Sequence, residues 1–246
     1  MDVAGSTGHA KHAIRKDSFD EALYENRGMN WFQRWLAGWR GEGPTRLVVV
    51  LVDGADLALV DRYLGEGLLP HLALVSDVGR RIDFAVGRSF EPPAIFELLR
   101  GQRIRTQILS QVPLDAAADL DAICASDRAQ QDRLRVALGR RRWRAVVAVF
   151  PMLAQLESLF GPTPDAEQRL VLRDVHVRMD EVVGKAMSFV DARTEFLAAI
   201  RPRRSTINAP AQAAVFVSRA VSDQPNGVDD LAEVVSQLLD GSARRA

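Results

Sequence analysis

The amino-acid sequence predicts an α/β protein, a three-layer sandwich with a mainly parallel central sheet and helices on both faces. Two observations predict this class. Short, continuous apolar runs rich in β-branched residues are typical of strands buried on both faces, and segments with helical periodicity separate these runs. The composition agrees, because 47% of the 246 residues are hydrophobic and 26% are charged, which is enough to bury a substantial core.

The first strand is the clearest element. Residues 46–52, RLVVVLV, are continuous and β-branched, and the strand ends at Asp53. Helical patterns follow over residues 56–64 and 70–77, and residues 80–87 form a second short strand. This alternation predicts the first crossover of the sheet.

The middle of the chain continues the pattern. A Pro-Pro pair suited to a first helical turn opens an expected helix over residues 91–99. A further strand is expected over residues 104–110, an Ala/Asp-rich helical segment over 115–123, and an amphipathic helix over 126–142.

The last part holds the second strong strand, AVVAVF at residues 145–150, and a helical pattern over 152–160. Asp165 follows a Gly-Pro-Thr-Pro turn and is an N-cap signal for a long helix that reaches about Val190. The remaining expected elements are strands over 195–200 and 213–218 and a terminal helix over 228–239.

The expected domains are an N-terminal extension over residues 1–43, a single α/β domain over 44–241 and a tail over 242–246. The extension holds Trp31, Trp35 and Trp39, which share one side of a short helix, with Arg34 and Arg40 elsewhere on it. These aromatic residues could pack on the core of the domain, dock on a partner protein or lie on a membrane surface.

Composition limits the classes of function. The formal net charge is zero, so a globally basic nucleic-acid binder is not expected. The chain has one cysteine, which excludes an intrachain disulfide framework, and it shows neither a membrane-spanning run nor a secretory leader, so we expect a cytoplasmic protein. Only three of the 32 basic residues are lysine, a bias typical of a GC-rich bacterial genome. Recognition of planar anions or of a protein interface, which arginine serves better than lysine, is the alternative.

Asp53 is the leading site candidate, because ligands of parallel sheets bind beyond the carboxyl ends of the strands. A helix-capping or turn aspartate is the alternative.

Three motifs carry a family resemblance: LVVVLVDGAD over residues 47–56, LLPHLALVSDVG over 68–79 and FEPPAIFELLRG over 90–101. Their order and spacing resemble the type I phosphodiesterase/nucleotide pyrophosphatase group of the alkaline phosphatase superfamily. The resemblance implies an alkaline-phosphatase-like core, reduced in size, in which Asp53 occupies a metal-binding position.

The catalytic residues of that family do not carry over. Phe96 stands at the position of the Thr or Ser nucleophile and has no nucleophilic atom. The next metal-ligand positions fall near Ala154 and Ser158, neither of which is a plausible zinc ligand. The resemblance therefore implies a pseudoenzyme that needs no metal and no cofactor.

Three arginines follow the strand at 195–200, namely Arg201, Arg203 and Arg204. One of them could pair with Asp53 and replace the charge of the lost metal, which would leave a salt-bridged relic site. A surface anion patch and a solvated basic turn are the alternatives. A second basic stretch, residues 140–144, contains Trp143 and could contact phosphate, RNA or an acidic partner. Nearby acidic residues balance its charge, which favours a mixed-charge surface instead.

Three functions remain open. The first is a non-catalytic protein-binding or assembly subunit that uses the Trp-rich segment and Arg-rich surfaces. The second is a metal-dependent phosphoric or sulfuric ester hydrolase with a rearranged site around Asp53. The third is an Arg-based module that binds an anion or a nucleotide without turnover.

Overall fold

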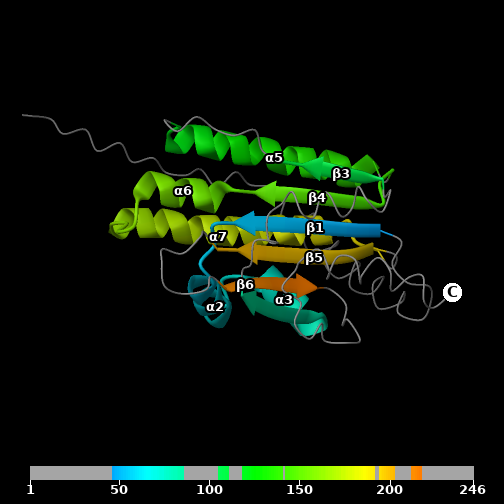
Figure 1. Ribbon diagram of the computed structural model, residues 1–246, viewed down its shortest axis with the longest axis horizontal. Coiled ribbons are helices and arrows are strands. Elements are labelled where there is room, and N and C mark those ends of the chain that lie inside the picture. The colour runs from blue at the N-terminus through cyan, green and yellow to red at the C-terminus, as the bar shows by residue number, and fades with distance from the viewer. Residues whose placement is uncertain are drawn as a thin grey trace, which may run out of the picture.

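The computed structural model describes residues 46–85, 105–110, 118–140, 142–191, 194–202 and 212–217. Six strands and five helices lie in these ranges and confirm the α/β class (Figure 1). In chain order they are β1 (Arg46–Asp53), α2 (Leu57–Gly65), α3 (Pro70–Val78), β2 (Arg80–Ala85), β3 (Thr106–Leu109), α5 (Leu120–Arg140), β4 (Ala145–Phe150), α6 (Met152–Phe160), α7 (Ala166–Met187), β5 (Thr194–Arg201) and β6 (Gln212–Val217).

The strands form one sheet in the order β2-β6-β5-β1-β4-β3. The pairings of β1 with β4, β1 with β5 and β3 with β4 are parallel. The pairings of β5 with β6 and β2 with β6 are antiparallel. The sheet is therefore mixed, and the expectation of a mainly parallel sheet is wrong.

Chain length explains why β6 reverses direction. Only residues 202–211 separate the end of β5 from the start of β6. A parallel neighbour needs a crossover of a dozen or more residues, whereas an antiparallel neighbour can follow a short connection. The apolar pattern of β6 identifies a buried strand but does not encode its direction.

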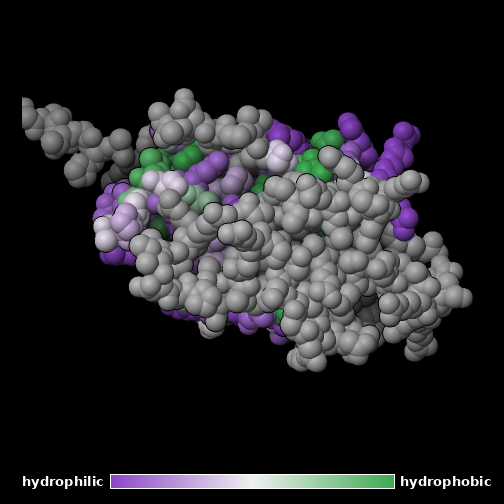
Figure 2. All heavy atoms as spheres, in the orientation of Figure 1, coloured by the Kyte–Doolittle hydropathy of each residue, from purple (hydrophilic) through white to green (hydrophobic). Residues whose placement is uncertain are grey.

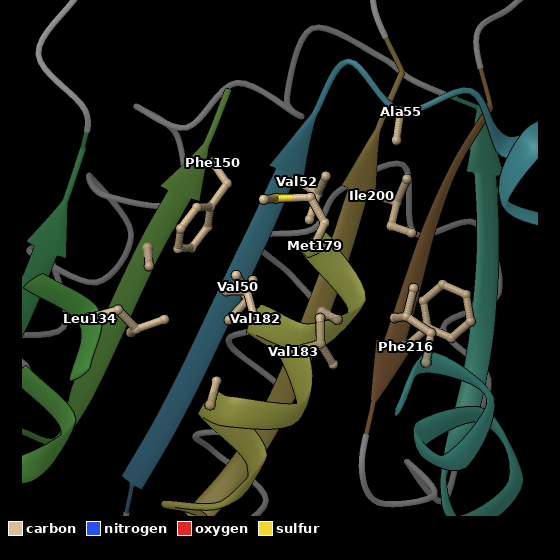
Figure 3. Close-up of a cluster of buried hydrophobic side chains, with 14 of the residues drawn as sticks. Val50, Val52, Ala55, Leu134, Phe150, Met179, Val182, Val183, Ile200 and Phe216 are labelled. Atoms are coloured by element: carbon tan, nitrogen blue, oxygen red, sulfur yellow. The ribbon is translucent and has the colours of Figure 1, made fainter. Parts of the chain in front are cut away.

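The described helices form one layer on one face of the sheet. The contacts of α7 with α3, α5 and α6, together with those between α2 and α3, join all five. Figure 3 shows Val182 and Val183 of α7 lying against Val50 of β1, with Phe216 of β6 near by. The described residues do not form the second helical layer expected from the sequence.

The other face of the sheet is equally apolar. Successive strand residues point to opposite faces, so Leu47, Val49 and Leu51 lie opposite the helical layer, and all three are fully buried. Burial on both faces explains why β1 is continuously apolar rather than alternating.

Helix caps match several expected boundaries. The carboxylate of Asp56 accepts from Ala58 N at 2.9 Å and begins α2. Asp165 and Gln168 form a reciprocal capping box that begins α7, as the turn signal predicted.

The two helical segments expected at 115–123 and 126–142 differ from the structure, in which α5 is continuous from Leu120 to Arg140.

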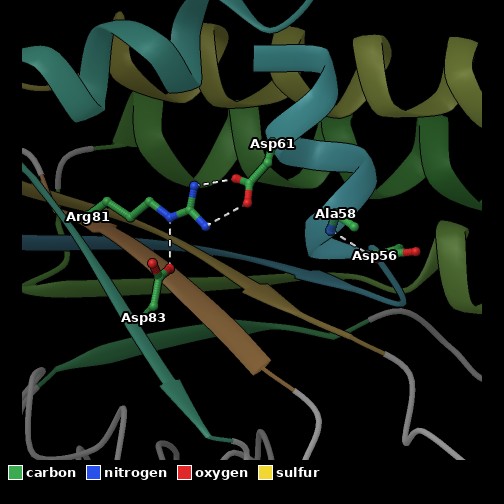
Figure 4. Close-up of polar contacts among 5 residues, drawn as sticks. All are labelled: Asp56, Ala58, Asp61, Arg81 and Asp83. Carbon is green, nitrogen blue, oxygen red and sulfur yellow. Dashed lines mark hydrogen bonds and ion pairs between the residues drawn. The ribbon is translucent and has the colours of Figure 1, made fainter. Parts of the chain in front are cut away.

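An ion-pair network joins β2 to α2 (Figure 4). Arg81 of β2 donates from Nη1 and Nη2 to the two carboxylate oxygens of Asp61 and from Nε to Asp83 at 2.7 Å. The hydrogen bond with Asp61 is the main cause that raises the pKa of Arg81. This network fixes the edge strand against the helix that follows β1.

No helix in the described part of the chain is long and apolar enough to cross a membrane. The proposed domain boundaries and the helices expected over 91–99 and 228–239 lie outside the described residues.

Candidate functional site

The candidate site lies where β1 and β5 end, at the edge predicted from the sequence. Asp53 and Arg201 are neighbours in the parallel pairing of the two strands. Arg201 donates twice to the Asp53 carboxylate, from Nε to Oδ1 at 2.8 Å and from Nη2 to Oδ2 at 2.5 Å. The structure thus contains the contact that the salt-bridge hypothesis required; that Asp53 descends from a metal ligand stays a hypothesis.

The pair is largely withdrawn from solvent. The side chain of Asp53 is 16% exposed and that of Arg201 is 20% exposed. A two-point contact between a guanidinium and a carboxylate is among the stronger ion pairs, because both hydrogen bonds are charge-assisted and the planar groups match in shape. Each side chain supplies the counter-charge that the burial of the other requires.

Gly54 lets the chain turn away from the pair. Its φ angle is +90°, in the region that favours glycine, and its N–H donates to the carbonyl of Arg201 at 2.8 Å. A Cβ atom at this position would lie 2.2 Å from the backbone nitrogen of Ala154. The first turn of α6 therefore approaches the end of β1 as closely as a glycine allows.

The described side chains around Asp53 do not suit a metal ion. Both carboxylate oxygens of Asp53 accept from Arg201, whose positive charge opposes a bound cation. Ala154 has no ligand atom, and Ser158 donates its hydroxyl to the carbonyl of Ala154 at 2.9 Å. Within the described ranges, no group of three or more His, Cys, Asp or Glu side chains could hold a metal.

Most of the other candidate residues cannot be placed. Phe96, Arg203 and Arg204 lie outside the described residues, as do the residues of the Trp-rich segment, Trp31, Arg34, Trp35, Trp39 and Arg40. Their expected roles stay predictions.

Asp180 has a capping role that no motif in the sequence indicates. From α7, its carboxylate accepts from the backbone nitrogens of His71 at 3.0 Å and Leu72 at 2.8 Å, and it bonds His71 Nδ1 at 2.8 Å. Asp180 therefore caps α3 from a neighbouring helix. The sequence holds one indication that a cap is needed: Leu69 occupies the N-cap position of α3 and has no side-chain acceptor, so the helix needs a cap from elsewhere.

Two further buried groups have shifted pKa values. Burial raises the pKa of the Asp127 carboxyl, although a hydrogen bond from Gln131 at 2.8 Å opposes the shift. Burial also lowers the pKa of His176, which lies edge-on to Tyr63 with 5.3 Å between ring centroids. Neither Asp127 nor His176 has a described hydrogen bond to Asp53. We therefore treat them as groups that affect the stability of the fold and not as part of the candidate site.

Comparison of the chain with protein-family models and with curated proteins finds no match.

Proposed function

We propose that the chain is a non-catalytic protein-binding or assembly subunit, built on a degenerate form of the type I phosphodiesterase scaffold. The observation that carries the proposal is the two-point ion pair between Asp53 and Arg201. In the resembling family this aspartate binds a metal. In this chain Arg201, on the neighbouring strand β5 of the sheet, neutralises the charge of Asp53. That ion pair lets this edge of the sheet fold without a metal ion.

On this proposal, the scaffold binds a partner protein and does not catalyse ester hydrolysis. Phe96 at the nucleophile position also supports a non-catalytic role, because a phenyl ring cannot accept a phosphoryl group. The proposed contact surface is the Trp-rich segment of Trp31, Trp35 and Trp39 with Arg34 and Arg40, since tryptophan and arginine are common anchors of protein interfaces. The proposed setting is the cytoplasm.

The absence of catalysis is tested by metal binding and ester hydrolysis together. Purified full-length protein is dialysed against trace zinc and manganese, its metal content is measured, and hydrolysis of bis(p-nitrophenyl) phosphate is followed. We expect no stoichiometric metal and no hydrolysis above that of Asp53→Asn. One or two metals per chain, lost in Asp53→Asn together with a measurable hydrolysis rate, would establish the hydrolase alternative instead.

The docking role is tested with a triple variant. A protein that co-purifies with the wild-type chain is expressed separately and titrated against wild type and Trp31→Ala/Trp35→Ala/Trp39→Ala. We expect the triple variant to lose the complex and to keep its unfolding transition. Arg173→Gln, which removes an exposed charge of α7, is the matched control and should bind as wild type does. Retained binding by a folded triple variant contradicts the proposed surface.

A further inference from the structure

A pocket of about 600 Å³ lies at the opposite end of the strands from Asp53. Its described lining comes from the start of β3 and from the segment that links α5 to β4, and it consists of Arg105, Thr106, Gln107, Arg140, Arg142 and Trp143. Figure 2 shows hydrophilic side chains projecting at the end of the molecule where α5 ends and β3 begins. The volume suits a small molecule.

The register of the sheet brings these arginines together. Thr106 of β3 pairs with Ala145 of β4, so the residues before the two strands are neighbours. The backbone nitrogen of Arg144 donates to the carbonyl of Arg105 at 3.0 Å, which joins the two segments just before the strands begin. Arg140 is the last residue of α5, and Arg142 follows it in the link to β4. Two chain segments about 35 residues apart in sequence therefore supply three guanidinium groups to one pocket.

The charge of the pocket is not balanced within its described lining. The three arginines carry three formal positive charges, and no acidic residue is among the described residues that line the pocket. This differs from Arg201, which is held by Asp53, and from Arg46, which pairs with Asp191 at 3.0 Å. Guanidinium groups that converge on a concave site favour a ligand of opposite charge, and their planar donors match phosphate oxygens.

Trp143 adds a second, independent observation. It lines the pocket, is only 4% exposed, and its indole nitrogen is buried without a hydrogen-bond partner. A buried tryptophan N–H usually has an acceptor. The amide oxygen of Gln107, on the same lining, is also buried without a partner. Two residues of the pocket lining, Trp143 and Gln107, thus each hold a buried polar atom without a hydrogen-bond partner, behind the three arginines.

A further arginine, Arg46, lies over the ring of Trp143. The guanidinium of Arg46 lies 5.6 Å from the centre of the indole ring, and Asp191 holds Arg46 in turn. This stacking fixes the ring in place, so Trp143 belongs to a built wall rather than to a mobile surface.

We propose that this pocket binds a phosphorylated small molecule with two or more phosphate charges, a diphosphate ester or a free diphosphate. Arg105, Arg140 and Arg142 contact the phosphate oxygens, the Trp143 indole donates to the ligand, and the Gln107 amide accepts from a hydroxyl or N–H of the esterified part. The proposal does not depend on the protein-binding role, because the pocket and the Asp53 edge lie at opposite ends of the strands.

Calorimetry on the full chain tests the site. Inorganic phosphate, pyrophosphate and ADP are titrated separately in 50 mM NaCl into wild type, Arg105→Gln and Arg142→Gln. We expect one pyrophosphate per chain, weaker binding of phosphate, and a loss of about tenfold in affinity for each variant. Tighter binding of ADP than of pyrophosphate assigns the ligand as an ester, and equal binding assigns the diphosphate group alone; both results support the pocket.

Arg135→Gln is the matched control, since it removes the same charge from a side chain of α5 that is 72% exposed and does not line the pocket. It should bind pyrophosphate within twofold of wild type. No saturable binding of any of the three probes, or an equal loss in Arg135→Gln, overturns the proposal. A single-stranded RNA that displaces pyrophosphate at lower concentration would also overturn the assignment of a small-molecule ligand.

A spectroscopic measurement covers the possibility that a variant fails to fold. The chain has four tryptophans, and the indole N–H signal of Trp143 is assigned by its loss in Trp143→Phe. In the wild-type protein we expect this signal to move with pyrophosphate concentration along the calorimetric binding curve. Binding of pyrophosphate with this signal unmoved places the anion elsewhere and overturns the site.

Discussion

Arginine serves two different purposes at the two ends of the parallel strands. At the carboxyl ends of β1 and β5, Arg201 lies against Asp53 through two hydrogen bonds, and the charges cancel. At the amino ends of β3 and β4, Arg105, Arg140 and Arg142 line a pocket whose described residues include no acid. We infer that the same side chain stabilises the fold at the Asp53 end, called the closed edge below, and leaves charge for a ligand at the pocket end, called the open edge.

The difference teaches how to separate structural from binding arginines in this chain. A structural arginine has a buried counter-charge, so its removal should lower the free energy of unfolding. A binding arginine without a counter-charge should cost little stability when it is removed, and should change affinity instead. Four predictions are ordered from the largest to the smallest expected effect: two on arginines test this contrast, and two measure the packing and burial on which the fold depends.

The largest effect is expected at Gly54, on the closed edge. Gly54→Ala places a Cβ 2.2 Å from the backbone of Ala154 in a residue whose φ is +90°. We expect a loss of about 4 kcal/mol in the free energy of unfolding, measured by urea denaturation, because backbone strain and overpacking add. Gly67→Ala is the control: its φ is +71° but nothing lies within 4 Å of the added atom. It should cost only about 1 kcal/mol, and equal costs would show that the α6 contact is unimportant.

The Asp53–Arg201 pair is tested by a double-mutant cycle. Asp53→Asn and Arg201→Gln each leave a largely buried charge without its partner, so each should cost about 2–3 kcal/mol in urea denaturation. The double variant should cost less than the sum by about 1–2 kcal/mol, because no uncompensated charge remains. Additive losses would mean that the two side chains do not act as a pair.

A third effect depends on pH and concerns His176, a buried residue of α7. Burial lowers the pKa of His176, so the folded protein keeps this ring neutral while the unfolded chain protonates it below about pH 6.5. The sign follows: the unfolded state binds more protons, and stability falls as pH falls through that value. We expect wild type to lose about 1 kcal/mol more than His176→Gln between pH 7.5 and 5.5 in urea denaturation. Parallel losses in both proteins would assign the acid sensitivity to other groups.

Part of this arrangement was predictable from sequence. The continuous apolar run of β1 identified a buried strand, and its end placed Asp53 at the edge of the sheet. The position of Arg201 just after an expected strand suggested a pairing that the structure contains. Asp165 marked the start of α7 because its capping box is a local signal.

The remaining features depend on non-local geometry. The direction of β6 is not encoded in its apolar pattern, so the mixed sheet could not be predicted from periodicity. The pocket joins Arg105 to Arg142 only through the register of β3 on β4, which the sequence does not specify. Taken alone, the stretch at 140–144 favours a mixed-charge surface over a phosphate contact, and nothing in the sequence places it beside Arg105.

The smallest effect should have the opposite sign from the others. Arg142→Gln removes one of three like charges from the open edge, which relieves repulsion in the absence of a ligand. We expect the free energy of unfolding to rise by about 0.5 kcal/mol in 20 mM NaCl and the gain to disappear in 300 mM NaCl, where screening removes the repulsion. Arg135→Gln, which loses its partner Asp132, should show no gain at either salt concentration. A destabilised Arg142→Gln would mean that this arginine already has a structural counter-charge, and the contrast between the two edges would then fail at its open end.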